Sequence, residues 1–292
     1  MRRIFKDDLQ EAEFKKKGYV KVDLIPQETV TTLLNQLQQM RPDDKFDPDG
    51  KGLSRSTYHC TFLDSNVEYK RKVSELINSI FTKVMHQYLI DYKILTSNFY
   101  VKPPGKGTFQ IHQNWPTTEN INDTTLTIWT PLVDVDRQNG AIQVVEGSHK
   151  IVPDIAAATV PHYFCDFEDE LIGKYLEVIP MKAGEGLIFD DSLIHYSGRN
   201  TSDNPRYAIQ IETLPQEINP VVYYYDVNSG KNEFEIFEVN SEFFIKNSLE
   251  HLLTRPKLKS LGFVENRNKI LSEQEFVEKL QSGDKTRSVI YG

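Results

Sequence analysis

Two histidines and one arginine are the residues of this chain whose types and spacing could build a metal site. His112 ends an apolar run at residues 109–111, and His195 ends a second run 83 residues later. Arg206 follows His195 by 11 residues and opens another apolar segment. Imidazoles on strands can hold a divalent ion, so this pattern predicts a metal centre in the strand-rich half of the chain.

Asn114 is the candidate third ligand. Residues i and i+2 of a strand point to the same side, so His112 and Asn114 can face one ion. Non-haem Fe(II) sites combine two histidines with a carboxylate and leave other coordination positions open. Asn114 offers a neutral amide oxygen instead, so we expect weaker iron binding and one more positive charge at the site. A carboxylate could come from Asp123, Asp190 or Asp191.

Arg206 predicts an anion site if it is buried. A buried guanidinium needs an anionic partner, and its planar fork matches a carboxylate. We expect its strand to pair near the His195 strand, although a surface arginine at a strand start is the simpler interpretation of Arg206 alone. His149 lies in a turn-like segment. Four further histidines have no partner at ligand spacing and are expected to be structural or exposed: His59, His86, His162 and His251.

The elements that carry these residues change in type near residue 92. Apolar positions at steps of three and four predict helices at 25–37 and near 66–90. Beyond residue 92, short β-branched and aromatic runs alternate with turn clusters. Strands are predicted near 93–102, 108–113, 124–134, 141–146, 175–180, 186–190, 193–198 and 206–214. This pattern favours a β-sandwich or barrel, of which the double-stranded jelly roll is one form.

The C-terminal part predicts a hairpin at 220–239 and then helix, with a capping box at residues 272–275. We expect one domain over residues 1–292. Its parts are a helical region at 1–92, a jelly-roll core at 93–215 and an extension at 216–292. Covering loops within 40–62, 114–124 and 150–172 would shape a binding pocket.

Composition narrows the classes of partner. The net charge is −8 and no basic stripe is present, so nucleic acid is not an expected partner. The two cysteines favour a reduced, cytoplasmic setting. No apolar run reaches the roughly 18 residues that span a bilayer, and the first residues do not read as a signal peptide. We expect a small-molecule substrate and a monomer or homodimer.

Several motifs together resemble the phytanoyl-CoA dioxygenase family of Fe(II)/2-oxoglutarate-dependent oxygenases. They span about residues 10–215: the segment 14–20, Lys102-Pro103-Pro104-Gly105, Trp129 with 135–140, the segment 146–150, and the segment 195–206. The resemblance implies a mainly β fold with flanking helices, a double-stranded β-helix (jelly roll) with N-terminal helices packed on one sheet. It also implies Fe(II), 2-oxoglutarate and O2 as cofactor and co-substrates, with hydroxylation of a small molecule as the expected reaction.

The family likeness implies roles for particular residues. His112 and His195 would bind the iron, with Asn114 standing where the family has an Asp ligand. Arg206 would hold the distal carboxylate of 2-oxoglutarate with help from Ser197. Three more residues would border the co-substrate: Asn98, Gln113 and Trp129.

Asn114 leaves alternatives open. It can be a weaker ligand in a working enzyme, an altered Asp, or the mark of a chain that has lost oxygenase activity and kept the fold as a metal- or ligand-binding protein. Besides an oxygenase and an inactive binding protein, a third hypothesis for the function is a cupin-type isomerase or epimerase that needs metal but no 2-oxoglutarate. The sequence does not name the substrate.

Overall fold

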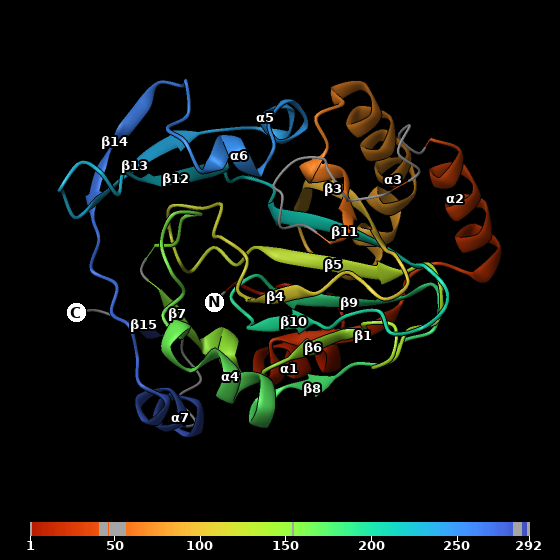
Figure 1. Cartoon of the computed structure of the whole chain (residues 1–292), viewed down its shortest axis with the longest axis horizontal. Helices are drawn as coiled ribbons and strands as arrows, with labels where there is room; N and C mark the ends of the chain where they lie inside the picture. The colour runs from red at the N-terminus through yellow and green to blue at the C-terminus, as the bar shows by residue number, and fades with distance from the viewer. Residues whose placement is uncertain (1, 41–45, 47–56, 154, 283–287, 291–292) are drawn as a thin grey trace.

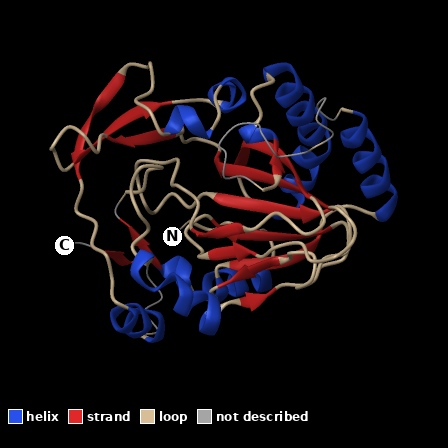
Figure 2. Cartoon of the chain, in the orientation of Figure 1, coloured by secondary structure: helices blue, strands red, loops and turns tan. Residues whose placement is uncertain are grey.

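Two facing antiparallel sheets form the core of the chain. The computed structural model describes residues 2–40, 46, 57–153, 155–282 and 288–290. The larger sheet has the order β1 (Tyr19–Asp23), β9 (Glu185–Asp190), β5 (Leu126–Pro131), β11 (Arg206–Pro215), β3 (Tyr92–Lys102) and β2 (His59–Cys60). The smaller sheet has the order β4 (Phe109–His112), β10 (His195–Ser197), β6 (Ile142–Val144) and β8 (Glu177–Val178). Figure 2 shows these strands as the centre of the molecule, which confirms the predicted jelly roll.

Helices α2 (Gln27–Gln39) and α3 (Val67–Tyr88) lie together on one side of the larger sheet (Figure 1). Their apolar stripes pack against Phe99 of β3 and against Ile209 and Ile211 of β11 in one buried cluster. Alternate residues of β11 therefore face the helices, and the residues between them face the smaller sheet. The expected packing of N-terminal helices on one sheet is confirmed.

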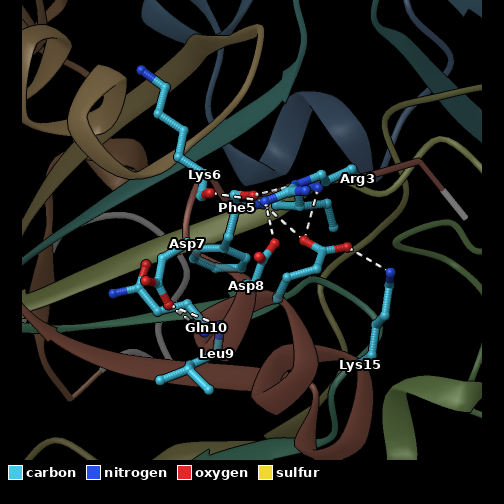
Figure 3. Close-up of polar contacts among 10 residues, drawn as sticks. Arg3, Phe5, Lys6, Asp7, Asp8, Leu9, Gln10 and Lys15 are labelled. Carbon is cyan, nitrogen blue, oxygen red and sulfur yellow. Dashed lines mark hydrogen bonds and ion pairs between the residues drawn. The ribbon is translucent and has the colours of Figure 1, made fainter.

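The N-terminal helix α1 (Asp8–Lys17) leads into β1 through a tight turn. The Asp7 carboxylate accepts hydrogen bonds from the main-chain N–H groups of Leu9 and Gln10, which caps the helix (Figure 3). Gly18 ends it with φ +87°, a left-handed conformation that glycine adopts without strain. The predicted helix-to-strand step at residues 14–20 is present.

The C-terminal extension departs from the prediction. The hairpin is β12 (Val221–Tyr225) and β13 (Glu233–Glu238), but β14 (Ser260–Glu265) adds a third strand where helix was expected. Residues of β14 alternate between half-buried and exposed, and pairing with β13 decides its conformation. Three short helices do form there: α5 (Ser241–Lys246), α6 (Leu249–Leu252) and α7 (Glu273–Gln281), the last with the predicted capping box.

The predicted loop at 150–172 also holds regular structure. It begins with β7 (Ile151–Pro153), which pairs in parallel with β15 (Ser288–Ile290). It continues into three short helical turns: η3 (Cys165–Phe167), α4 (Glu168–Glu170) and η4 (Leu171–Tyr175). Apolar contacts with α7 hold these turns, and such contacts are invisible to local sequence patterns. Most of the predicted loop at 40–62 lies outside the described residues; its end contains β2, followed by η1 (Thr61–Leu63).

No helix in the described part of the chain is both long and apolar enough to cross a membrane.

Candidate metal and co-substrate site

His112 and His195 lie opposite each other on β4 and β10, with ring centroids 4.1 Å apart. The Nδ1 atom of His112 lies 2.8 Å from the carbonyl oxygen of Gln110, and that of His195 lies 2.9 Å from the carbonyl oxygen of Leu193. A carbonyl accepts only from an N–H, so each ring carries its proton on Nδ1 and leaves Nε2 as a free lone pair. In metal sites, such a hydrogen bond from the ring nitrogen that does not bind the metal fixes the orientation of the histidine.

Burial keeps both imidazoles neutral. It lowers the pKa of His195 to about 4, and burial together with repulsion from His195 holds the pKa of His112 well below its usual range. Neutral imidazoles are the form that binds metals. Among the described residues no group of three His, Cys, Asp or Glu side chains could hold an ion, so a third ligand would have to be of another type.

Asn114 follows the end of β4 and lies beside this pair. Its Nδ2 atom donates to Thr127 Oγ1 at 2.8 Å and to Asp191 Oδ1 at 3.1 Å. Both N–H groups of the amide are thereby engaged, and the side chain lies close enough to influence the pKa of His112. The amide oxygen therefore points to the side of the histidines, where a metal ligand is needed.

Arg206 lies in the larger sheet and reaches across the interior to the smaller one. Its Nη2 atom lies 3.4 Å from Ser197 Oγ, and its guanidinium stacks 5.4 Å from the ring centroid of Trp129. The expectation that its strand pairs near the His195 strand is wrong, because β11 pairs with β3 and β5 whereas β10 pairs with β4 and β6. The two side chains approach because the sheets face each other.

A second buried cation lies beside Arg206. Lys102 is 2% exposed and pairs with Arg206 across β3 and β11. Its Nζ atom donates to Ser197 Oγ at 2.5 Å and to the carbonyl oxygens of Ser197 and Gly198. A Cβ atom at Gly140 would lie 2.6 Å from the Gly198 oxygen and 3.1 Å from this Nζ, so glycine is required there.

The two cations have no carboxylate to balance them among the described residues. Burial lowers the pKa of Arg206 to about 9, so Arg206 stays charged. Burial followed by repulsion from Arg206 lowers the pKa of Lys102 to about 5, so Lys102 would hold its charge at neutral pH only beside a bound anion. Arg206 Nε and Nη1 are buried without a hydrogen-bond acceptor in the described structure. Buried cations of this kind need a counter-charge. The arrangement is therefore suited to a small anion.

Asn98 and Gln113 line a cavity of about 680 Å³ that also reaches His112 and Asn114. Asn98 Oδ1 accepts a hydrogen bond from Thr61 Oγ1 at 3.1 Å. Gln113 turns inward because β4 ends at His112, and its Nε2 atom donates to the main-chain oxygens of Ser192 and Ile151. Its Oε1 atom has no partner among the described residues.

The cavity wall is mostly apolar and aromatic, as in pockets for small molecules. The C-terminal extension contributes part of that wall through Val222, Phe244, Leu249 and Leu252. The lining does not include His195, Ser197, Lys102 or Arg206, so these side chains do not form part of the cavity wall.

Four residues at the site were missed or left unassigned by sequence reasoning: Lys102, Thr127, His162 and Glu212. Lys102 could have been found, since it faces inward on a strand beside the Arg206 strand. His162 lines the cavity, and burial lowers its pKa to about 4. Burial, followed by repulsion from Asp191, raises the pKa of Glu212 to about 8. Nothing in local sequence marks Thr127.

Comparison with known proteins gives consistent matches. The model of the phytanoyl-CoA dioxygenase (PhyH) family matches residues 14–208. A phytanoyl-CoA dioxygenase domain-containing protein 1 homolog of Dictyostelium discoideum is 27% identical over 164 residues, 53% of this chain and 55% of that protein. A probable alpha-ketoglutarate-dependent hypophosphite dioxygenase of Stutzerimonas stutzeri is 27% identical over 155 residues, 48% and 53% of the two chains. The match thus spans about half the length of these relatives.

Solved structures agree on the fold. A non-heme alpha-ketoglutarate-dependent carbocyclase of nogalamycin biosynthesis superposes with a TM-score of 0.52 at 17% identity, over 73% of this chain and 86% of that one. HygX from Streptomyces hygroscopicus, solved with nickel and 2-oxoglutarate bound, gives 0.52 at 13% identity, over 72% and 88%. At these identities the likeness shows the jelly-roll fold alone.

Proposed function

Because the chain belongs to the phytanoyl-CoA dioxygenase family, we propose that it is an Fe(II)- and 2-oxoglutarate-dependent oxygenase that hydroxylates a small molecule. His112, His195 and Asn114 would hold the iron. Arg206 and Lys102, with Ser197 between them, would bind the distal carboxylate of the co-substrate. Bound iron and 2-oxoglutarate would supply the oxidising chemistry, with O2 consumed and succinate and carbon dioxide released.

The observation that carries this proposal is the pair of buried cations close to two neutral imidazoles. Ser197, which touches both cations, follows His195 by two residues on β10. Two residues of a strand span about 6.6 Å. A five-carbon dicarboxylate can bridge such a distance, with one end at the metal and the other at the cations. The carboxylate would supply the counter-charge that Arg206 and Lys102 lack.

The chain's own residues would orient and protect the reactants. Trp129 covers one face of the Arg206 guanidinium and keeps water from it. Asn98 and Gln113 border the cavity beside His112, where the free Gln113 Oε1 can accept a hydrogen bond. The substrate would occupy the apolar cavity, with the C–H bond to be attacked near the histidines. The extension that forms part of the wall lies outside the matched residues 14–208, so substrate choice would differ from that of the relatives.

An anaerobic titration with Fe(II) and 2-oxoglutarate tests the proposal. We expect the visible charge-transfer band of the ternary complex, and succinate formation once O2 is admitted. His112→Gln should abolish the band, whereas His162→Gln, a matched change at the other cavity histidine, should keep it. Absence of both band and succinate in the unaltered protein would refute the oxygenase.

The same measurement separates the two rival hypotheses. A metal-binding protein without activity, which Asn114 alone favours, would bind Fe(II) and release no succinate. An isomerase or epimerase that needs metal only would convert substrate without 2-oxoglutarate. The buried Arg206 beside Lys102, with no carboxylate partner among the described residues, favours the oxygenase over both, because neither rival requires a dianion beside the metal.

A further inference from the structure

Asn114 is held by a buried carboxylate rather than by solvent. Asp191 is 5% exposed, and its main-chain oxygen accepts from the Asn114 N–H at 2.9 Å. Its Oδ1 atom accepts from Asn114 Nδ2 at 3.1 Å and from Thr127 Oγ1 at 2.7 Å. Residue 114 is thus held by its main-chain N–H and by its side-chain Nδ2 atom, through residues of two neighbouring elements.

This network determines which end of the amide faces the metal position. Thr127 Oγ1 donates to Asp191, so its remaining lone pair accepts from Asn114 Nδ2 at 2.8 Å. Both N–H bonds of the amide are then directed away from the histidines. Only the carbonyl oxygen of Asn114 remains on their side.

Asp191 is a buried carboxyl group with no cation beside it in the described part of the chain. No lysine or arginine there lies within ion-pair distance of it, and its partners are hydroxyl and amide groups. A buried carboxylate without a cation is costly unless a positive charge is supplied from outside the chain. A divalent ion at the histidine pair would lie on the far side of the Asn114 amide.

We propose that Asp191 is a positioning residue, which turns the Asn114 carbonyl oxygen to the metal and places the missing negative charge one hydrogen bond behind the ligand. The inference rests on the proposed metal site. In this arrangement the pair Asn114–Asp191 replaces a single ligating carboxylate. The amide supplies the oxygen, and the carboxylate polarises that amide through its N–H.

Exchanging the two side chains tests the proposal. Binding of Co(II), a spectroscopic substitute for Fe(II), is measured anaerobically by calorimetry and by its visible bands. Asp191→Asn should weaken Co(II) binding by about 10- to 100-fold, the range found for partners of metal ligands. The double variant Asn114→Asp/Asp191→Asn should restore binding to the original affinity or better, because residue 191 can then donate its amide N–H to a ligating carboxylate.

Two further variants sharpen the result. Asn114→Asp alone would place two carboxylates at hydrogen-bond distance, where they must share a proton, so it should gain less than the double variant. Asp190→Asn is the matched control: Asp190 is a neighbouring buried carboxylate that accepts from the Ser192 N–H instead, and Co(II) affinity should change by less than about threefold.

The outcomes are distinguishable. Unchanged affinity in Asp191→Asn, or a double variant no better than Asp191→Asn, overturns the positioning role and leaves the proposed oxygenase intact. Failure of the unaltered protein to bind Co(II) or Fe(II) overturns both. If Asp191→Asn does not fold, as judged by circular dichroism, the double variant still decides, since it keeps the same number of hydrogen bonds.

Discussion

The inner face of β11 carries basic groups at one end and acidic groups at the other. Arg206 lies beside Lys102 at one end, and Glu212 lies near Asp191 at the other. Six residues of a strand separate the two ends by about 20 Å, so the groups at the two ends do not form ion pairs with each other. Neither end has a partner of opposite sign within ion-pair distance among the described residues.

The ends differ in what surrounds them. The basic end is buried against Trp129 and Ser197 and is not part of the cavity wall, whereas Glu212 lines the cavity. A closed charged site fits one small ion of fixed shape, and an open one can meet ligands of varied shape. We therefore expect the basic end to bind the co-substrate and the acidic end to contact the substrate.

The largest expected effect is on 2-oxoglutarate binding and comes from removing Arg206, whose Nε and Nη1 atoms have no acceptor in the described structure. Arg206→Ala should weaken 2-oxoglutarate binding by about 100-fold, because the carboxylate would lose a buried charged partner. Metal affinity should stay within about threefold. Calorimetry with Co(II) and then 2-oxoglutarate measures both, with the exposed Arg137→Ala as control. Equal losses for the two ligands would mean that Arg206 supports the fold rather than the anion.

At the acidic end we expect a pH-dependent change in stability. Burial raises the pKa of Glu212 to about 8 in the folded chain, above its unfolded value near 4.5. Between these values the folded chain holds a proton that the unfolded chain lacks, so stability is full below pH 4.5 and falls as pH rises through 8. Relative to Glu212→Gln, the unaltered protein should lose about 2 kcal/mol between pH 5 and pH 8, a figure reduced because the carboxyl borders the cavity.

Urea unfolding at several pH values measures this difference. Glu265→Gln, an exposed change on β14, should show no such trend. A constant difference between Glu212→Gln and the unaltered protein across the range would mean that Glu212 is ionised in the folded chain. The acidic end would then resemble an ordinary surface carboxylate.

Lys102→Met should have the smallest effect of the three. The Lys102 ammonium already has three oxygen neighbours, so it adds charge to the anion site but no free hydrogen-bond donor. We expect 2-oxoglutarate to bind about tenfold more weakly, measured by the same titration. A loss as large as that of Arg206→Ala would show that the two cations act as one unit.

The sequence predicted the fold well where local periodicity and burial agree. The helices at α2 and α3 and eight of the ten strands of the two core sheets were located, because each buries one regular face. The third hairpin strand β14 and the turns at residues 165–175 were missed, because pairing with β13 and packing on α7 form them. For the candidate site, the two histidines, Asn114, Arg206 and Ser197 were picked out, and the structure brings all five around one interior region.

The sequence by itself determined the chemistry that is available: two imidazoles and an amide at metal-ligand spacing, and an arginine downstream. Residue types and their alternation along strands are local properties, which sequence records directly. Only the tertiary structure decided that Arg206 reaches Ser197 from the opposite sheet, that Lys102 lies beside it, and that Asp191 and Thr127 hold the Asn114 amide. Those contacts join residues far apart in the chain, and they depend on how two sheets face each other.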